Sequence, residues 1–313
     1  MQCSIQWNTL ELDEWEARFR NISRSTLLQS YDYALAACPL YGQRVRWGLI
    51  MMDGREAGIV QLLEAGILWN ALHAIIVDRG PLWFQGFGGI VHWKLFLEEL
   101  SRQFPKRLGR KRRLIPEIND SAATQSLITQ AGWIYQGPKY TTIWLDLSKP
   151  LESLRESLRK NWRGALNKAE KGPLEIVFDP STKYLPDTVQ AYVMDRKRRN
   201  YPGPEEKLVM ALGAQSAARG NLLIGRALLD NRCVGSVLVL IHGSSATYQI
   251  GWVDEDGKKH GAHYRLLWSV LGILKDRGVL SFDLGGIHDE ASGVSTFKDG
   301  LGGERITLSG LYI

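Results

Sequence analysis

The sequence predicts an α/β (α+β) protein of two domains, each with a mixed sheet flanked by helices. The chain has 313 residues, which is enough for two domains of roughly 150 residues each. Segments with the two-residue period of strands alternate with segments of helical period along the whole chain. Each half runs from strands to a helix and then to a further strand, so the two halves follow one plan.

In the first half, apolar and β-branched runs on either side of the turn Asp-Gly-Arg-Glu indicate two paired strands. Phe96, Leu100 and Phe104 follow at helical spacing, and a Ser cap and a terminal Gly bound a second helix. The expected strands cover residues 44–53, 56–67, 73–83, 112–118 and 141–148, and the expected helices cover 90–104 and 121–132.

The second half begins with the strongest helical pattern, which Gly172-Pro173 ends. One apolar stripe defines this single helix: Leu151, Leu154, Leu158, Trp162, Ala165, Leu166 and Ala169. The strands expected after it cover 174–179, 221–231, 233–243, 245–254, 279–286 and 304–313, and the helices cover 188–199, 206–220 and 263–278. We predict two domains, residues 1–147 and 148–313, and leave open whether the last strand packs with the first domain.

The charge of the chain favours an anionic partner. The net charge is +6 and the sequence pI about 9.2, which suits RNA, phosphorylated substrates or an anionic membrane surface. Residues 102–113 hold seven Lys or Arg and no acid, and 195–200 form a second basic cluster. We expect the first cluster to bind tRNA phosphates through Arg110, Lys111, Arg112 and Arg113; the alternative is a solvated basic surface.

Other features exclude several classes of protein. Three widely spaced cysteines form neither a disulfide framework nor a metal-ligand pattern, and the histidines do not pair with other ligands, so we expect no metal and no cofactor. No basic flank precedes an apolar run at the start, and no run approaches the length of about 20 residues that a membrane span needs. We expect a cytoplasmic protein, and peripheral contact with a membrane surface is compatible with this sequence.

Three stretches carry the candidate site. Residues 158–172 present a basic helix face that includes Lys160 and Arg163. Residues 242–268 lead from a strand with Tyr248 and Gly251 into a Gly-containing loop, which suits an anion at a helix start. Residues 282–304 follow Asp283 with glycine pairs, and Phe297-Lys298 stands before the last of them. We expect a strand there, with Phe297 buried and Lys298 directed out of the core towards a ligand.

These stretches resemble the Fem-type aminoacyl-tRNA-dependent peptidyltransferases, the FemABX family. "FDLGG…GVSTFKDGLGGE" resembles the closing signature of the family, and "TTIWLDLSKPLESLRESLRKNWRGALNKAEKG" is similar to its strand and basic helix. "QSYDYALA" and "VDRGPLW" resemble family stretches in the first half, so the resemblance spans nearly the whole chain. Leu301 replaces the usual aromatic residue and Trp162 a commoner Thr, and there is no tRNA-binding coiled-coil arm.

The resemblance implies two tandem GNAT-like domains with the active cleft in the second. It also implies amide-bond formation, with an amino acid moving from aminoacyl-tRNA to an amine of a peptide or peptidoglycan precursor. One alternative is an N-acyltransferase that uses acyl-CoA or another thioester on a sugar or amino acid. The other is a catalytically silent module that binds RNA or a partner. "KKHGAH", residues 258–263, only approximates the acyl-CoA loop.

The reaction assigns expected roles to these residues. Lys298 would stabilise the oxyanion or contact a donor phosphate, and Asp283 would accept from the attacking ammonium or cap its loop. Arg163 would hold a phosphate or carboxylate with both arms of its guanidinium. The other expected substrate or donor contacts are Tyr248, Tyr264, Lys160, Gly251, Phe297, Gly302 and Gly303, of which the two tyrosines would instead be packing residues on the alternative interpretation.

Overall fold

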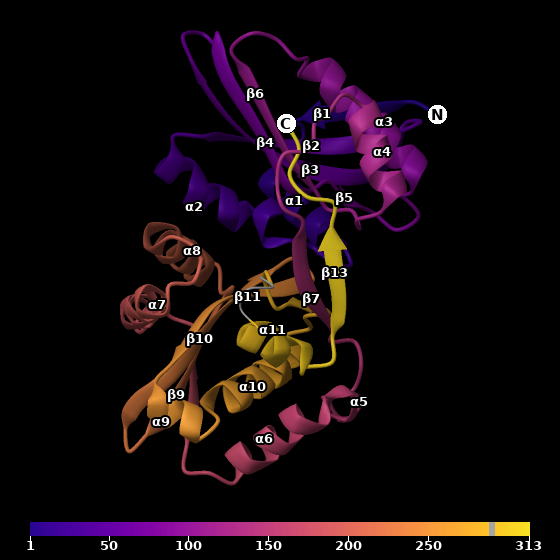
Figure 1. Cartoon of the computed structure of the whole chain (residues 1–313). Coiled ribbons are helices and arrows are strands. Elements are labelled where there is room, and N and C mark those ends of the chain that lie inside the picture. Colours follow the sequence, from indigo (N-terminus) through magenta and orange to yellow (C-terminus); the bar gives the residue numbers. More distant parts are fainter. Residues whose placement is uncertain (288–291) are drawn as a thin grey trace. The chain divides into compact units, whose positions relative to one another are not determined.

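A computed structural model describes residues 1–287 and 292–313 of the chain. Contacts divide it into two compact units, shown in Figure 1. Unit 1 comprises residues 1–141 and 306–313, and unit 2 comprises residues 142–305. The expected domain boundary at residues 147 and 148 falls slightly after this division, and the expected last strand contributes residues to both units.

Unit 1 contains a mixed sheet in the order β1-β2-β3-β4-β6, with β5 paired to β3. All pairs are antiparallel except β4 with β6. Trp93, Phe96 and Leu97 of α3 are buried in its core, which confirms the helix expected at 90–104. The strands are β1 (Cys3–Trp7), β2 (Arg44–Met52), β3 (Arg55–Ile67), β4 (Leu72–Gly80), β5 (Leu82–Trp83) and β6 (Arg110–Pro116), and the helices are α1 (Leu12–Arg20), α2 (Tyr31–Tyr41), α3 (Ile90–Gln103) and α4 (Ala122–Gln130).

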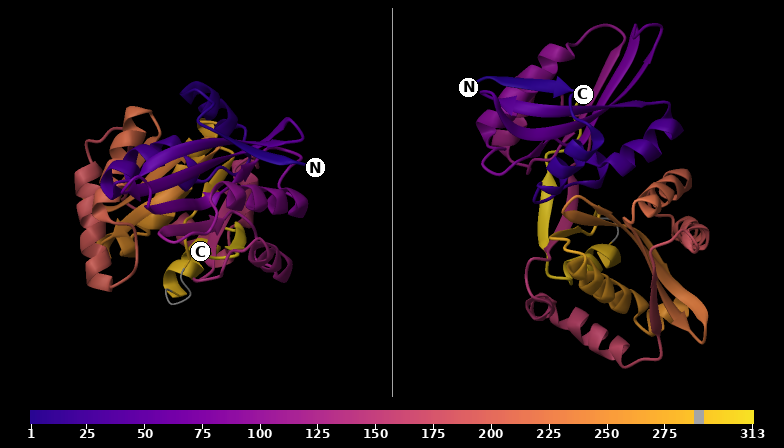
Figure 2. Two further views of the ribbon diagram at one scale, coloured as in Figure 1. Left: turned by 90° about the horizontal axis from the view of Figure 1, so that it is seen from above. Right: turned by 180° about the vertical axis from the view of Figure 1, so that it is seen from behind.

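Unit 2 is built on a seven-stranded sheet in the order β13-β7-β12-β11-β10-β9-β8. Helices α7 and α8 cover one face of β9–β11, and α10 with α6 covers the other face (Figure 2). The strands are β7 (Tyr140–Asp146), β8 (Glu175–Asp179), β9 (Leu222–Leu229), β10 (Arg232–His242), β11 (Ser245–Val253), β12 (Ser281–Asp283) and β13 (Glu304–Leu308). The helices are α5 (Leu151–Ser157), α6 (Lys160–Glu170), α7 (Leu185–Arg199), α8 (Glu206–Ala218), α9 (Glu255–Lys259), α10 (Ala262–Asp276) and α11 (Ser292–Asp299).

Two expectations about elements are wrong in ways that affect the site. The single helix expected at 151–169 is two helices, because Leu158 and Arg159 adopt extended backbone with ψ of 135° and 145°. Lys298 lies in helix α11 and not in a strand. Val294, Phe297 and Leu301 follow one another at spacings of three and four, which is helical periodicity that the dense glycines after them obscured.

Candidate active site

Glycines after α11 allow a turn to pack closely on the break between α5 and α6. The backbone N–H of Arg159 donates to the carbonyl of Gly300 at 3.0 Å. A Cβ at Gly300 would lie 2.4 Å from Cδ1 of Trp162, and one at Gly302 would lie 2.3 Å from the carbonyl oxygen of Ser157. Gly302 also has a φ of +78°, which L residues rarely adopt. These glycines therefore shape the site, and they need not touch a ligand to do so.

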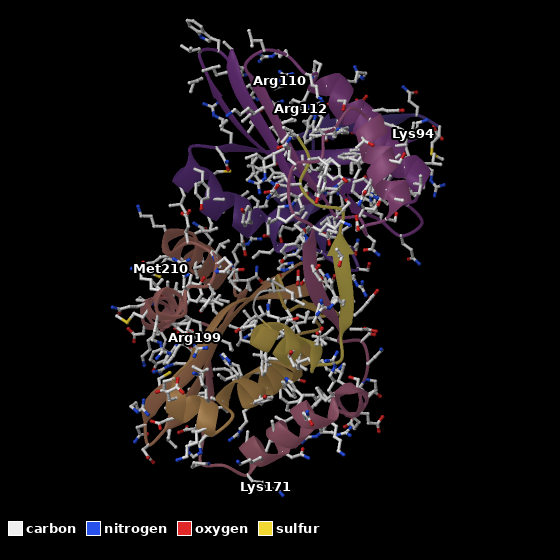
Figure 3. All side chains as sticks on the ribbon, in the orientation of Figure 1. Lys94, Arg110, Arg112, Lys171, Arg199 and Met210 are labelled. Atoms are coloured by element: carbon white, nitrogen blue, oxygen red, sulfur yellow. The ribbon has the colours of Figure 1, made fainter. Side chains whose placement is uncertain are left out.

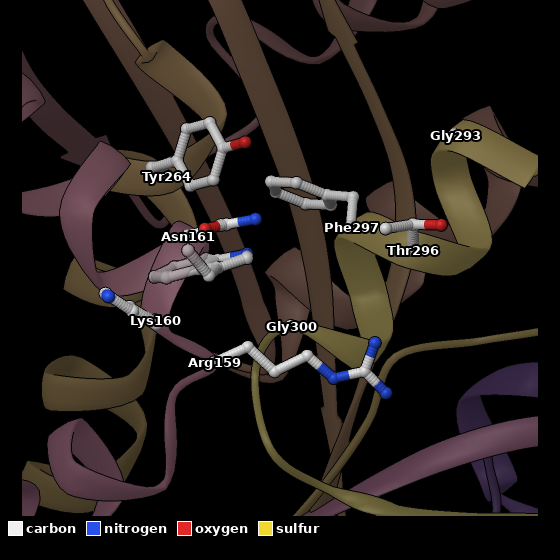
Figure 4. A pocket seen from close by; sticks show the side chains of 9 residues that line it. Arg159, Lys160, Asn161, Tyr264, Gly293, Thr296, Phe297 and Gly300 are labelled. Atoms are coloured by element: carbon white, nitrogen blue, oxygen red, sulfur yellow. The ribbon is translucent and has the colours of Figure 1, made fainter.

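A pocket of about 510 Å³ opens beside this contact, between the start of α6, the start of α10 and α11 (Figure 4). Three aromatic rings form an apolar cluster at the pocket: Trp162 lies 5.0 Å from Tyr264 and 5.8 Å from Phe297, centroid to centroid. Tyr264 and Phe297 lie 5.1 Å apart, edge to face. The lining residues are Arg159, Lys160, Asn161, Trp162, Tyr264, Gly293, Thr296, Phe297 and Gly300.

The mouth of the pocket is positively charged. Arg159 and Lys160 are both exposed at the first turn of α6, where backbone N–H groups add partial positive charge. Figure 4 shows the Arg159 guanidinium extending past Gly300 below Phe297. Arg163, one turn later, donates to the carbonyl of Glu156 at 3.3 Å and is not among the lining residues. Of the basic residues expected on this helix, Lys160 lines the pocket, and so does its neighbour Arg159.

Lys298 lies on another side of α11 and is buried, with 7% of its surface exposed. Its ammonium donates to the carbonyls of Gly286 at 2.9 Å and Gly285 at 3.3 Å, and lies 5.7 Å from the Tyr248 ring centroid. Burial lowers the pKa of Lys298 to about 8, while the nearby charge of Asp283 opposes that shift. Lys298 is thus a fixed cation held by backbone dipoles.

Strands β11 and β12 separate next to Lys298. They pair in parallel only from Ser245 to Thr247. Tyr248 follows, and the register between β10 and β11 shifts at this residue. A Cβ at Gly251 would lie 2.1 Å from the Tyr248 hydroxyl oxygen, so this glycine makes room for the phenol. Burial raises the pKa of Tyr248, which keeps the phenol protonated at neutral pH.

Asp283 organises the loop that holds Lys298. Its Oδ1 accepts hydrogen bonds from the Thr142 hydroxyl and from the backbone N–H of Gly285 at 2.8 Å. The Thr142 hydroxyl also lies 3.1 Å from the carbonyl of Gly285. These contacts agree with the loop-capping alternative for Asp283. Gly303 lies close to β7, the strand that carries Thr142, because a Cβ at Gly303 would stand 2.6 Å from the carbonyl oxygen of Trp144.

Several residues at the site were not expected from the sequence. Asn161 and Thr296 line the pocket, and Thr142 reaches Asp283 from a distant segment. His263 lies 6.0 Å from the Phe297 ring, and burial lowers the pKa of His263 to about 4. Polar residues of this kind carry no local pattern, so only the fold brings them together. The sequence also suggests His288 and Asp289 as an exposed, titratable pair, and both lie outside the described residues.

The predicted tRNA-binding residues do not form one exposed patch, because β6 alternates its side chains between two faces. Arg112 is buried, lies 4.2 Å from the Trp133 ring centroid and donates to the carbonyl of Gly132, so the expected phosphate contact is wrong for this residue. Arg113 is exposed and pairs with Asp78 at 3.0 Å. Lys111 is exposed. Arg110 is half-buried, and its guanidinium donates a hydrogen bond to the His73 ring.

The loop before α10 already uses one of its backbone donors. It forms the short helix α9, whose first turn holds Glu255 and Asp256 after the cap Asp254. The Asp254 carboxylate accepts from the N–H of Gly257 at 2.7 Å, which occupies a donor that an anion would use. Arg232 pairs with Asp254 and Asp256. Lys258 pairs with Glu255, and Lys259 lies in the same short helix, so the acids and cations of this segment balance and give it no net charge against a diphosphate.

The described residues contain no cluster of three or more His, Cys, Asp or Glu side chains that could hold a metal ion. None of the helices in this part of the chain combines the length and hydrophobicity that a membrane crossing requires.

Comparison with known proteins identifies the fold. The acetyltransferase (GNAT) domain model matches residues 156–299, all within unit 2. No curated protein matches the sequence significantly. The crystal structure of FemX superposes with a TM-score of 0.81 at 13% identity, covering 98% of this chain and 96% of that one.

Two other solved structures share the architecture at lower similarity. The C-terminal domain of a putative lysylphosphatidylglycerol synthetase from Agrobacterium fabrum has a TM-score of 0.53 at 14% identity, covering 96% of this chain and 91% of that one. A tandem GNAT protein from the clavulanic acid biosynthesis pathway has a TM-score of 0.52 at 13% identity, covering 99% and 98%. The expectation of a tandem GNAT architecture is confirmed: the chain has the tandem GNAT-like fold seen in FemX, and the part of its second unit from residue 156 to 299 matches the acetyltransferase (GNAT) domain model.

Proposed function

We propose that unit 2 transfers an aminoacyl group to an amine and so forms an amide bond. The observation that carries this proposal is the buried ammonium of Lys298, fixed by two backbone carbonyls beside the point where β11 and β12 separate. A lysine ammonium has three N–H donors, and Gly285 and Gly286 accept from it in the described part of the chain. We assign the remaining donor to an oxyanion.

The reaction needs little covalent chemistry from the protein. The neutral amine of the acceptor attacks the carbonyl carbon of the donor ester, a C–N bond forms, and the carbonyl oxygen becomes an oxyanion. Lys298 stabilises this charge, and collapse breaks the C–O bond so that the donor hydroxyl leaves with a proton lost by the amine. One preorganised donor of this kind contributes about 3 kcal/mol to transition-state stabilisation.

The pocket at α6 supports a nucleotide donor. Arg159 and Lys160 suit a phosphate, and the rings of Trp162, Tyr264 and Phe297 provide apolar and aromatic surface beside them. The terminal nucleotide of aminoacyl-tRNA combines these two requirements. Acyl-CoA is the second candidate, because the Asp254 carboxylate occupies the Gly257 N–H that a diphosphate would use. We expect the reaction in the cytoplasm, where charged tRNA occurs.

We propose a peptide or a peptidoglycan precursor as the acceptor, on the strength of the overall similarity to FemX. A mixture of charged tRNAs and, separately, a panel of acyl-CoA thioesters should be incubated with candidate amines, and the transferred group read by mass spectrometry. Transfer from charged tRNA supports the leading proposal. Transfer only from the thioesters replaces it with an N-acyltransferase, and no transfer from either supports a silent RNA- or partner-binding module.

The role of Lys298 is tested by Lys298→Met, which keeps most of the apolar stem and removes the cation. We expect the maximal rate to fall by roughly 100-fold or more, as for other oxyanion donors. Lys298→Arg should not restore it, because a planar fork differs from a compact ammonium. A rise in the Michaelis constant of the donor, with an unchanged maximal rate, would instead indicate a ground-state phosphate contact.

Lys275 provides a matched control within unit 2. Its ammonium also donates to two backbone carbonyls, those of Leu147 and Lys149, each at 2.6 Å. Lys275 lies at the end of α10 and does not line the pocket. Lys275→Met should therefore leave the transfer rate within about twofold of the unaltered protein. Equal losses in both variants would mean that Lys298 has a purely structural role.

A further inference from the structure

One end of unit 1 exposes an unusual group of apolar side chains. The turn between β3 and β4 and the loop before β6 lie side by side, since the N–H of His73 donates to the carbonyl of Gly109 at 2.8 Å. This end of the sheet projects beyond the helices of unit 1 in Figure 1. Its exposed side chains, here called the apolar tip, are Ile67 (63% exposed), Leu68 (68%), Trp69 (102%), Leu72 (49%) and Leu108 (99%).

The apolar tip has a defined backbone that holds these side chains outward. Leu68, Trp69 and Asn70 have φ values of 51°, 51° and 66°, three successive left-handed residues of which none is glycine. Each such conformation is unfavourable for an L residue, and strain of this kind concentrates at functional positions. The guanidinium of Arg107 joins the two loops, since it donates to the carbonyl oxygens of Asn70 and, at 3.0 Å, of Ala71.

Positive charge surrounds the apolar tip. Residues 104–113 contain six Lys or Arg and no acid, and residues 65–77 contain no acid either. Lys106, Arg107 and Lys111 are exposed, while Arg112 is buried. Figure 3 shows Arg110 and Arg112 beside the strands that lead to this end. The apolar tip thus has exposed Lys and Arg side chains next to it.

We propose that the apolar tip of unit 1 inserts into the surface of an anionic lipid bilayer. An aromatic ring and aliphatic side chains that enter the interface by about 5–10 Å, with Lys and Arg behind them at the level of the headgroups, form the usual composition of an interfacial anchor. The charge complementarity selects an anionic surface over a neutral one. This inference does not depend on the reaction proposed for unit 2.

Two other occupants fit these observations less well. Single-stranded RNA binds by stacking bases on aromatic rings, but four of the five side chains in the apolar tip are aliphatic. A second copy of the chain would bring the same cations face to face.

The test is co-sedimentation of the full chain with vesicles of phosphatidylcholine containing about one third phosphatidylglycerol, and with pure phosphatidylcholine. We expect binding to the anionic vesicles, loss of binding as salt rises, and weak binding to neutral vesicles. Trp69→Ser and Leu108→Ser should each weaken binding about tenfold, because each removes one large apolar side chain from the buried set. Lys106→Gln with Lys111→Gln should weaken it by roughly 25-fold, about fivefold for each cation.

Val91→Ser is the matched control, since Val91 is 57% exposed in the same unit but lies at the start of α3. It should bind anionic vesicles like the unaltered protein. Circular dichroism should show that all variants are folded. Unchanged vesicle binding by Trp69→Ser and Leu108→Ser would overturn the proposal. So would variants that bind vesicles normally but lose affinity for tRNA, or that lose a concentration-dependent dimer seen by light scattering.

Discussion

Lys298 shows how a single residue can be costly to fold and useful to chemistry. Its ammonium is removed from water and compensated by two neutral carbonyls, those of Gly285 and Gly286. A carboxylate pair would hold the charge more tightly but would neutralise the field that an oxyanion needs. The lowered pKa of Lys298 reports this compromise, because burial disfavours the charged form. Sites of this kind commonly trade stability for activity.

The trade gives a stability prediction for Lys298→Met. The pKa of Lys298 is about 8 in the folded protein, against an ordinary value of 10.5. Below pH 8 the lysine is therefore protonated in both the folded and the unfolded protein, and burial of its charge lowers the free energy of unfolding. Between about pH 8 and 10.5 the unfolded state binds more protons, and the free energy of unfolding rises with pH. Lys298→Met should be more stable by about 1–2 kcal/mol at pH 7, after allowing for lost hydrogen bonds.

Urea unfolding at a series of pH values measures this difference. The advantage of Lys298→Met over the unaltered protein should shrink as the pH rises from 8 to 10. An advantage that does not change with pH would show that burial of the ammonium is not its source.

At the scale of elements, the site depends on the interruption between α5 and α6. The apolar stripe from Leu151 to Ala169 continues through the interruption, since Leu158 and Trp162 are both buried. The turn after α11 fills the break and places the first turn of α6 at the pocket. A continuous helix would have no exposed N–H groups there, and Arg159 would lose its position at the mouth.

The packing of this turn predicts different effects for a glycine in the turn and a glycine in α11. Gly302→Ala combines a φ of +78° with a contact of 2.3 Å to the Ser157 carbonyl, so it should destabilise unit 2 by roughly 2–4 kcal/mol. Gly293→Ala lies in α11 with nothing within 4 Å of its Cβ, so it should be neutral or stabilising by up to about 1 kcal/mol. Thermal unfolding of both variants provides the comparison. Equal effects would refute the account of the turn.

The sequence predicts most elements of the fold because their periodicity is local. Leu100 and Phe104 identify α3 without any knowledge of their partners. The sequence does not predict the break between α5 and α6. No capping residue marks this break, and the carbonyl that accepts from the Arg159 N–H belongs to Gly300. The glycines around Lys298 draw attention to this lysine in the sequence, but its hydrogen-bond partners are the carbonyls of Gly285 and Gly286, outside that stretch. Composition likewise reveals the basic run at 110–113 and not the burial of Arg112.

At the scale of the whole molecule, unit 1 is completed by residues 306–313, which follow all of unit 2 in the chain. Tyr312 is fully buried, and its backbone exchanges two hydrogen bonds of 2.9 Å with Leu114. Ile313 exchanges two more with Ile134, at 2.8 and 2.9 Å. The core of unit 1 therefore contains a segment from the far end of the sequence.

Removal of residues 309–313 should selectively loosen unit 1. Loss of the buried Tyr312 side chain alone should cost about 3–5 kcal/mol, as for other large aromatic residues. Hydrogen exchange followed by mass spectrometry should show faster exchange in residues 110–116 and 133–136, with α10 of unit 2 unchanged. Uniform acceleration in both units would mean that they unfold as one cooperative body.

This order of assembly has a consequence for biosynthesis. A ribosome makes the sheet of unit 1 first, but residues 306–313 emerge only after unit 2 has been translated. Until then the partners of Tyr312 remain uncovered, and the nascent unit 1 presents an unfinished apolar surface of the kind that chaperones bind. Translation that stops anywhere within unit 2 leaves a first unit without the segment that completes its core, so this apolar surface stays exposed.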